Sequence, residues 1–382
     1  MKIAIATDTY FPRINGVSTS TRVFARDFCN LGHKVDVHAP DFPNYSEEQE
    51  LFEVFRYPSF YLAFDPEDRL AYGLRRQKKN FLAQKYDIVH TQTPFFLGWL
   101  AARWAKSKRI KVVHTCHTLY SAYIDYYLQF LPRKLKAISA RQISKRYCDM
   151  CDLIIAPSPA MRDEVISYGT KCPTVVIPTG IDLSEFENPD PDSFRRKYNF
   201  SRDDKILLFV GRLAKEKNID FLLRIFARVS KKNANAHFLI AGDGPARKEL
   251  EAAVKIAQLS PRVRFLGYLK GDDLKDCYAA ADLFLFASLT ETQGLVITEA
   301  MSCGTPVVAI GKMGTIDIMS ENRGGLLVGE DEDEFCKAVI EMLENNNLYS
   351  LKKKETFGEA RKRSSLEIAK RVLNEYEKII GG

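Results

Sequence analysis

Long apolar segments are missing from this 382-residue chain, and no run approaches the ~20 residues that a membrane-spanning helix needs. The amino-terminal MKIAIATDTYF has one lysine and an early aspartate, so it is a poor secretory signal and predicts a first β-strand. Low-complexity tracts and short repeats are missing too. With 46% hydrophobic and 27% charged residues, we expect a soluble cytoplasmic protein of about two or three domains.

Cysteine pairs at redox or zinc-binding spacing are also scarce. The eight cysteines are scattered through apolar stretches, which is typical of reduced, buried thiols. Cys148 and Cys151 have CxxC spacing, but no second such pair accompanies them. We therefore interpret them as small apolar side chains at a helix–strand junction.

The excess of positive over negative charge is confined to the first half of the sequence. The net charge is +7, and residues 1–180 contain 25 basic and 17 acidic residues, whereas residues 181–382 contain 31 and 32. This asymmetry indicates that the first half meets an anionic surface.

Short runs rich in valine, isoleucine and leucine alternate with helical patterns in two series. The first series is KIAIATD, KVDVHAP, YDIVHTQT, KVVHTCHT and DLIIAPS, and the second is KILLFV, AHFLIA, RVRFLGYL, DLFLFAS and TPVVAIG. Such runs predict buried parallel strands joined by helices. The proline- and aspartate-rich stretch between the series predicts a linker near 180–205. We expect an α/β protein of two doubly wound, Rossmann-like domains facing a cleft, with ligands bound beyond the carboxyl ends of the strands.

Two features follow strands in the first half. Asn15-Gly16 marks a tight turn, which serves turn geometry or lets the backbone approach a phosphate or sugar. His90, His114 and His117 lie near strand ends, but residues i and i+3 of a strand point to opposite faces. We therefore expect no metal site, and we expect His117 to act in hydrogen bonding or proton transfer.

In the second half, Arg212 and Lys217 follow the strand KILLFV. A guanidinium fork and an ammonium together suit a diphosphate, and the position at a strand end favours this role over that of a solvated loop. The turn GDGP, which begins at Gly242, is not a dinucleotide fingerprint because Arg247 stands where GxGxxG needs its third glycine. The sequence therefore argues against a dehydrogenase.

Glu291 and Glu299 bracket the start of another predicted helix, which ends before Gly304. Gly294 and Leu295 should present free backbone N–H groups there, as an anion site. At ~1.5 Å per helical residue the carboxylates stand up to ~12 Å apart, too far for the ~5–9.5 Å pair of a glycosidase. That separation suits an extended nucleotide sugar, with Glu299 on the ribose diol, Glu291 on the sugar hydroxyls and the helix terminus on the diphosphate.

Six motifs together make the chain similar, over its whole length, to the retaining GT-B glycosyltransferases of family 4. They are NGV (15–17), HTLY (117–120), PTGID (178–182), GRLAKEKN (211–218), AGDGP (241–245) and ETQGLVITE (291–299).

The resemblance implies metal-independent transfer from a nucleoside-diphosphate sugar, without a cofactor and without an assigned protein nucleophile. Gly16 and Gly242 would lie beside the donor, His117 near the sugar and acceptor, and the backbone around Gly267 and Tyr268 near the base. The domains would span 1–185 and 186–363, and a final helix over 364–382 would cross back to the first domain. Asp190-Pro-Asp192 mimics a metal-binding DxD motif, but it falls in the predicted linker.

Within the family, the chain most resembles bacterial diacylglycerol α-glucosyltransferases. Residues 69–85 and 133–146, both expected to be helical, each contain six basic residues and no acidic one. They predict contact with an anionic membrane surface, each exposed cation contributing about 1 kcal/mol, whereas the alternative is two solvated helices. No nucleic-acid-binding motif accompanies the charge. The cations expected at the membrane are Arg75, Arg76, Lys78, Lys79, Arg133, Lys134 and Lys136.

Other functions stay open at this point. A soluble sugar or cell-wall precursor could be the acceptor, a sugar-nucleotide epimerase could use the same fold, and a non-catalytic protein could merely bind nucleotide sugars or a membrane. The complete motif set favours a hexosyltransferase. The resemblance to diacylglycerol α-glucosyltransferases implies that it moves glucose from UDP-glucose to 1,2-diacylglycerol at the inner face of the membrane. The sequence does not indicate an oligomeric state.

Overall fold

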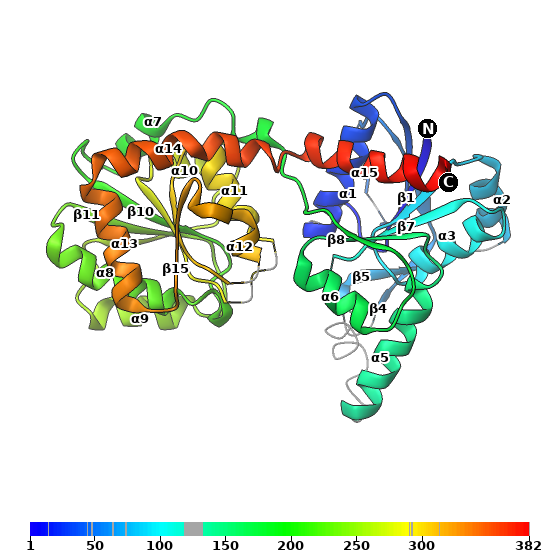
Figure 1. Cartoon of the computed structure of the whole chain (residues 1–382), viewed down its shortest axis with the longest axis horizontal. Helices are drawn as coiled ribbons and strands as arrows, with labels where there is room; N and C mark the ends of the chain where they lie inside the picture. The colour runs from blue at the N-terminus through cyan, green and yellow to red at the C-terminus, as the bar shows by residue number, and fades with distance from the viewer. Residues whose placement is uncertain are drawn as a thin grey trace. The chain divides into compact units, whose positions relative to one another are not determined.

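The computed structural model describes two compact units (Figure 1). The first unit comprises Met1–Gly180 and Ser365–Gly382, and the second comprises Ile181–Ser364. These divisions lie within a few residues of the boundaries that the sequence predicts, and the last helix belongs to the first unit. The structure describes residues 1–13, 15–43, 45–46, 49–62, 65–72, 75–117, 133–289, 291, 293–312 and 314–381, without the side chains of 62–68, 133–140 and 320.

A seven-stranded parallel sheet in the order β3-β2-β1-β6-β7-β8-β9 forms the centre of the first unit. Its strands are β1 (Lys2–Ala6), β2 (Lys34–Pro40), β3 (Glu53–Tyr57), β6 (Ile88–Thr91), β7 (Lys111–Thr115), β8 (Leu153–Ala156) and β9 (Thr174–Val176). The helices are α1 (Gly16–Asn30), α2 (Arg75–Ala83), α3 (Phe96–Lys106), α5 (Arg133–Cys148), α6 (Pro159–Ser167) and α15 (Ser365–Gly381).

Both faces of this sheet are covered, which explains why its central strands read as continuous apolar runs. Ile3 and Ile5 of β1 belong to a core cluster that includes side chains of α1 and α15. Ala4 and Ala6 point the other way, into a cluster with α3. Helix α15 contacts α1, as Figure 1 shows at the red end of the chain.

A small antiparallel hairpin corrects one sequence prediction. The strands β4 (Ser59–Leu62) and β5 (Asp65–Ala71) pair with each other, so the basic segment 69–85 is not one helix, and α2 begins only at Arg75. Arg69 is held in the hairpin because its guanidinium donates to Ser59 and lies 4.0 Å from the ring centroid of Tyr61.

The second unit has a six-stranded parallel sheet in the order β12-β11-β10-β13-β14-β15. The strands are β10 (Lys205–Val210), β11 (Ala236–Ala241), β12 (Val263–Gly267), β13 (Leu283–Phe286), β14 (Val307–Ile310) and β15 (Gly325–Val328). The longer helices are α7 (Pro191–Lys197), α8 (Ile219–Lys232), α9 (Arg247–Ile256), α10 (Asp272–Ala280), α11 (Leu295–Ser302), α13 (Glu332–Glu344) and α14 (Asn346–Arg361). Shorter turns are η1 (Leu183–Phe186), η2 (Lys215–Lys217), α12 (Gly314–Ile318) and η3 (Ser320–Asn322).

The stretch expected to be a linker is folded instead. Asp190 is the N-cap of α7, where its side chain accepts the backbone N–H of Ser193 at 2.8 Å, and Pro191 occupies the first turn. The aspartate–proline pattern therefore starts a helix of the second unit. The DxD-like spacing has this local structural cause.

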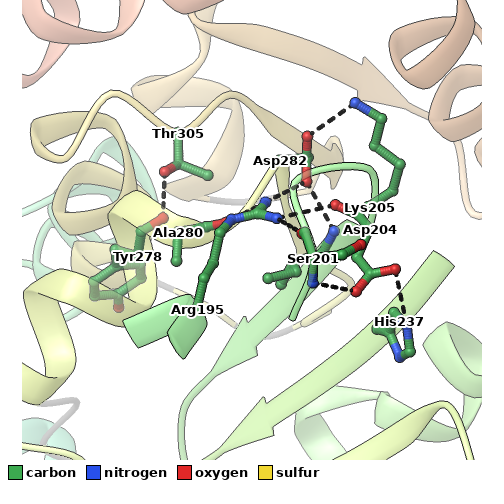
Figure 2. Close-up of polar contacts among 10 residues, drawn as sticks. Arg195, Ser201, Asp204, Lys205, His237, Tyr278, Ala280, Asp282 and Thr305 are labelled. Atoms are coloured by element: carbon green, nitrogen blue, oxygen red, sulfur yellow. Dashed lines mark hydrogen bonds and ion pairs between the residues drawn. The ribbon is translucent and has the colours of Figure 1, made fainter. Parts of the chain in front are cut away.

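A polar cluster ties α7 to the amino ends of the second sheet (Figure 2). The Arg195 guanidinium donates to the Ala280 carbonyl at 2.9 Å and to Asp282 Oδ2 at 3.2 Å. Asp282 also accepts the backbone N–H of Ile206 at 2.8 Å and pairs with Lys205 at 3.3 Å. These contacts stabilise the edge of the sheet opposite the carboxyl ends of its strands.

Among the helices that the structure describes, none has both the length and the apolar character needed to cross a bilayer. The cysteine pair lies at a helix–strand junction, as the sequence predicts, because Cys148 is the last residue of α5 and Cys151 shortly precedes β8. Cys148 and Cys151 are both buried in the core of the first unit.

Candidate functional site

Two glycine-rich loops pack against each other at the carboxyl ends of β10 and β11. The backbone N–H of Gly242 donates to the Gly267 carbonyl at 2.7 Å, and a Cβ at Gly242 would lie 1.9 Å from the Gly211 carbonyl oxygen. A Cβ at Gly244 would lie 2.4 Å from the Leu213 carbonyl oxygen. The glycines of AGDGP are therefore required by loop packing, which brings the loop after β10 to the edge of the sheet.

The two cations predicted after β10 each have a carboxylate partner. Arg212 is exposed and donates to Glu216 Oε1 at 2.5 Å. Lys217, in η2, donates to Glu291 Oε2 at 2.7 Å, and both side chains are only about 20% exposed. The structure thus brings together Lys217 and Glu291, which the sequence separates by 74 residues.

Glu291 also caps the helix that follows it. Its Oε1 accepts the backbone N–H groups of Gly294 at 3.1 Å and Gln293 at 3.3 Å. The prediction of a free N–H at Gly294 is therefore wrong for this structure, because the loop's own carboxylate supplies the anion at the helix N-terminus. Burial alone would raise the pKa of Glu291, but Lys217 and these N–H groups outweigh it and lower the pKa.

Glu299 lies within α11 in a more apolar setting. Its Oε2 accepts the hydroxyl of Tyr278, a fully buried residue of α10, at 2.8 Å. Burial raises the pKa of Glu299, and the Tyr278 hydroxyl opposes that rise only in part. Sequence reasoning missed Tyr278, because nothing in DLKDCYAAAD marks this aromatic residue as a partner of α11.

The remaining residues predicted at this edge follow strands or begin a helix as expected. Leu295 is the first residue of α11. Tyr268 follows β12 directly and is 69% exposed. Gly267 has a φ of +70°, in the region that favours glycine.

In the first unit, Gly16 begins α1 behind a well-formed cap. Asn15 Oδ1 accepts the Ser18 N–H at 2.9 Å, and Ser18 Oγ accepts the Asn15 N–H at 2.8 Å. A Cβ at Gly16 would meet no heavy atom within 4 Å among the described residues. Packing among the described residues therefore does not explain the glycine, and close approach of a ligand to the backbone stays a prediction.

A buried aspartate that the sequence did not single out fixes the neighbouring loop. Asp8 follows β1 and accepts the Thr93 hydroxyl at 2.6 Å and the Leu97 N–H at 2.7 Å. Burial raises the pKa of Asp8, and these hydrogen bonds counteract the effect. Asp8 therefore occupies the N-terminus of α3 and joins the ends of β1 and β6.

The three histidines make hydrogen bonds to uncharged side chains. His90 Nε2 lies 2.7 Å from Thr115 Oγ1, and His114 Nδ1 lies 3.0 Å from Thr91 Oγ1. His117 Nε2 lies 2.6 Å from the Gln92 side-chain oxygen. Burial lowers the pKa of His114 to about 3 and that of His117 to about 4, so both rings are neutral at pH 7. No cluster of three or more potential metal ligands occurs in the part of the chain that the structure describes.

The predicted membrane cations are described in part. Arg75, Arg76, Lys78 and Lys79 are exposed on α2, whose Phe81 is buried. The side chains of Arg133, Lys134 and Lys136 lie outside the described residues, as do residues 118–120 of HTLY.

Comparison with known proteins identifies the family. The model for "Glycosyltransferase Family 4" matches residues 14–185, and that for "Glycosyl transferases group 1" matches residues 190–364. Alpha-monoglucosyldiacylglycerol synthase of Streptococcus pneumoniae is 32% identical over 349 residues, which cover 90% of this chain and 78% of the relative. The chain belongs to glycosyltransferase family 4.

The other relatives include enzymes named for different sugars. The Acholeplasma laidlawii alpha-monoglucosyldiacylglycerol synthase is 29% identical over 356 residues, covering 90% of this chain and 89% of its own. A GDP-mannose-dependent alpha-mannosyltransferase of Corynebacterium glutamicum is also 29% identical, over 92% of this chain and 82% of its own. The family 4 enzyme described here is therefore a glycosyltransferase that uses a nucleotide-sugar donor.

Solved structures show the same fold. Anabaena HepE in complex with UDP superimposes with a TM-score of 0.75 at 19% identity, covering 99% of this chain and 100% of HepE. Sucrose-phosphate synthase of Thermosynechococcus elongatus gives 0.73 at 23% identity, covering 100% of this chain and 99% of that structure. The fold is GT-B.

Proposed function

We propose that this enzyme transfers glucose from UDP-glucose to 1,2-diacylglycerol, with retention of configuration at the anomeric carbon. The observation that carries the proposal is the half-buried Lys217–Glu291 pair, with a 2.7 Å contact, at the carboxyl edge of the second sheet. Ligands of doubly wound sheets bind at that edge. The two glucosyldiacylglycerol synthases among the relatives support glucose and the lipid acceptor.

In this proposal the chemistry depends on stabilising the departing diphosphate. Lys217 and Arg212 would meet its charge, each exchanging part of its present carboxylate contact for phosphate oxygens. Because these side chains supply the positive charge, we propose that transfer needs neither a metal ion nor a cofactor. The leaving phosphate would accept the proton of the attacking hydroxyl on the same face of the sugar.

Two acidic residues would orient the donor. Glu291 would accept hydrogen bonds from sugar hydroxyls while remaining ionised, since Lys217 and the backbone N–H groups hold its pKa below the ordinary value despite burial. Glu299 would accept the ribose hydroxyls, with one carboxylate oxygen fixed by Tyr278. The base would lie against the backbone at Gly267 and Tyr268.

The first unit would supply the acceptor side. His117 would contact the sugar or acceptor, and Gly16 would allow the backbone to approach the donor. The exposed cations of α2 follow closely on a hairpin whose Phe60 and Tyr61 are 51% and 55% exposed. Aromatic and basic side chains together suit the interface of an anionic bilayer, so we propose peripheral association with the inner face of the cell membrane.

A panel of donors and acceptors tests the proposal. UDP- and GDP-sugars are each incubated with and without diacylglycerol in anionic vesicles, and nucleotide release and lipid extracts are analysed. Lipid-dependent release of UDP from UDP-glucose, with a new glycolipid, is expected. Release of GDP from GDP-mannose, or transfer only to soluble sugars, would retain the transferase but refute the glycolipid assignment.

A further inference from the structure

A chain of hydrogen bonds links the last helix to His117 within the first unit. The Tyr376 hydroxyl lies 2.5 Å from His90 Nδ1. The Gln92 amide nitrogen lies 3.3 Å from Nδ1 and 3.2 Å from Nε2 of the same ring. The Gln92 amide oxygen lies 2.6 Å from His117 Nε2. Tyr376, His90 and Gln92 are at most 1% exposed, so solvent does not compete for these contacts.

We propose that Gln92 is a positioning residue that holds His117 as the Nε2–H tautomer. An amide oxygen can only accept, so the His117 nitrogen facing it must carry the proton. The other ring nitrogen, Nδ1, then carries the lone pair and can accept a hydrogen bond from a sugar or acceptor hydroxyl. This inference rests on the proposed function for the part that concerns substrate.

The orientation of the Gln92 amide follows from what surrounds His90. Tyr376 and Thr115 approach the two ring nitrogens of His90 with hydroxyl groups, which can each donate or accept. The Gln92 amide nitrogen lies 3.3 Å from Nδ1 and 3.2 Å from Nε2, so it faces the ring of His90, whose negative π face favours an N–H group over a carbonyl oxygen. With the amide nitrogen engaged there, the amide oxygen faces His117, and α15 takes part in orienting the site through Tyr376.

The use of an amide rather than a carboxylate has a chemical consequence. A carboxylate at this position would stabilise the imidazolium, whereas an amide leaves the ring neutral. Among the described residues, His90 and His114 interact electrostatically with His117, and burial lowers the pKa of both, so neither carries charge at pH 7. His117 thus offers a fixed, uncharged acceptor, which suits a hydroxyl whose proton must finally go to the leaving phosphate.

The test uses Gln92→Glu and Gln92→Met in the full chain, with Gln258→Glu as the matched surface control. Nitrogen-15 NMR of the ring nitrogens is tractable because the chain has 6 histidines. In the unaltered protein we expect His117 protonated at Nε2 and neutral throughout pH 5–8. In Gln92→Glu we expect the pKa of His117 to rise by at least about one unit, and an acidic inflection to enter the kcat profile.

Gln92→Met removes the acceptor, so His117 should populate both tautomers, and kcat should fall about tenfold while the KM for the donor changes little. Unchanged tautomer populations in Gln92→Met, or Nδ1–H in the unaltered protein, would overturn the proposal. If Gln92→Glu fails to fold, Gln92→Met still provides the tautomer measurement. The NMR result needs no substrate, so it stands or falls separately from the glycolipid assay.

Discussion

Acidification should destabilise the first unit selectively, because its buried histidines are neutral. His38 forms two hydrogen bonds. Its Nδ1 lies 2.9 Å from the Tyr57 hydroxyl, and its Nε2 lies 2.8 Å from the Tyr86 hydroxyl. Burial is the main cause that lowers the pKa of His38 to about 3, and burial likewise lowers that of His114 to about 3. In the unfolded chain both would titrate near 6.5.

The sign and size of the effect follow from proton linkage. Between pH 6.5 and pH 5 the two imidazoles bind protons in the unfolded state but stay neutral in the folded state. The free energy of unfolding therefore falls as pH falls. At ~1.4 kcal/mol per pKa unit, each of these histidines lowers the free energy of unfolding by about 2 kcal/mol between pH 6.5 and pH 5. Asp8 acts in the opposite direction, because burial raises its pKa and a protonated carboxyl favours the folded state.

The assay can isolate the first unit, since Trp99 and Trp104, the chain's 2 tryptophans, both lie in α3. Denaturant unfolding followed by tryptophan fluorescence should show a midpoint that falls from pH 7 to pH 5. His38→Gln should flatten this dependence by about 2 kcal/mol, whereas His237→Gln in the second unit should not. A pH-independent midpoint, or no effect of His38→Gln, would refute the burial argument.

Three further predictions concern the site and the membrane. Tyr278→Phe removes the hydroxyl that donates to Glu299, so the free energy of unfolding should fall by about 1–3 kcal/mol in calorimetry, while Tyr198→Phe should have little effect. Lys217→Met should lower kcat/KM about 10²–10³-fold in initial-rate assays because the leaving diphosphate loses its cation, and an unimpaired variant would remove Lys217 from the mechanism. Replacing Arg75, Arg76, Lys78 and Lys79 by glutamine should weaken co-sedimentation with anionic vesicles, as should added salt. The same change at Lys231, Lys232, Lys248 and Lys255 of the second unit should not do so.

Much of the fold could be predicted because its central strands are buried on both faces. LFLF is apolar throughout, and so is KILLFV after Lys205. Both units have such strands at their centres. Edge elements were harder to predict. The sequence EVFRY of β3 is only partly buried, and β9 has three residues, so neither has a strong pattern. The end of β5, residues 69–71, was included in a predicted helix over 69–85 because the run of basic residues that starts there continues into α2.

The part of the candidate site that lies in loops after strands could be predicted from the sequence. Lys217 and Glu291 lie in the segments that follow β10 and β13, but only the structure shows that they are in contact. Partners that lie inside helices gave no signal. Tyr376 meets His90 across 286 residues, and Tyr278 meets Glu299 from a neighbouring helix. At the N-terminus of α11, the sequence predicted a free N–H at Gly294. It did not indicate that the Glu291 carboxylate accepts this N–H.

The central claim is that a glucosyl group passes from UDP-glucose to diacylglycerol with retention. The most direct measurement is NMR of the lipid product formed from UDP-[¹³C]glucose and diacylglycerol vesicles. We expect one α-configured glucosyl diacylglycerol for each UDP released. A β-configured product, or UDP release without glucolipid, would contradict it.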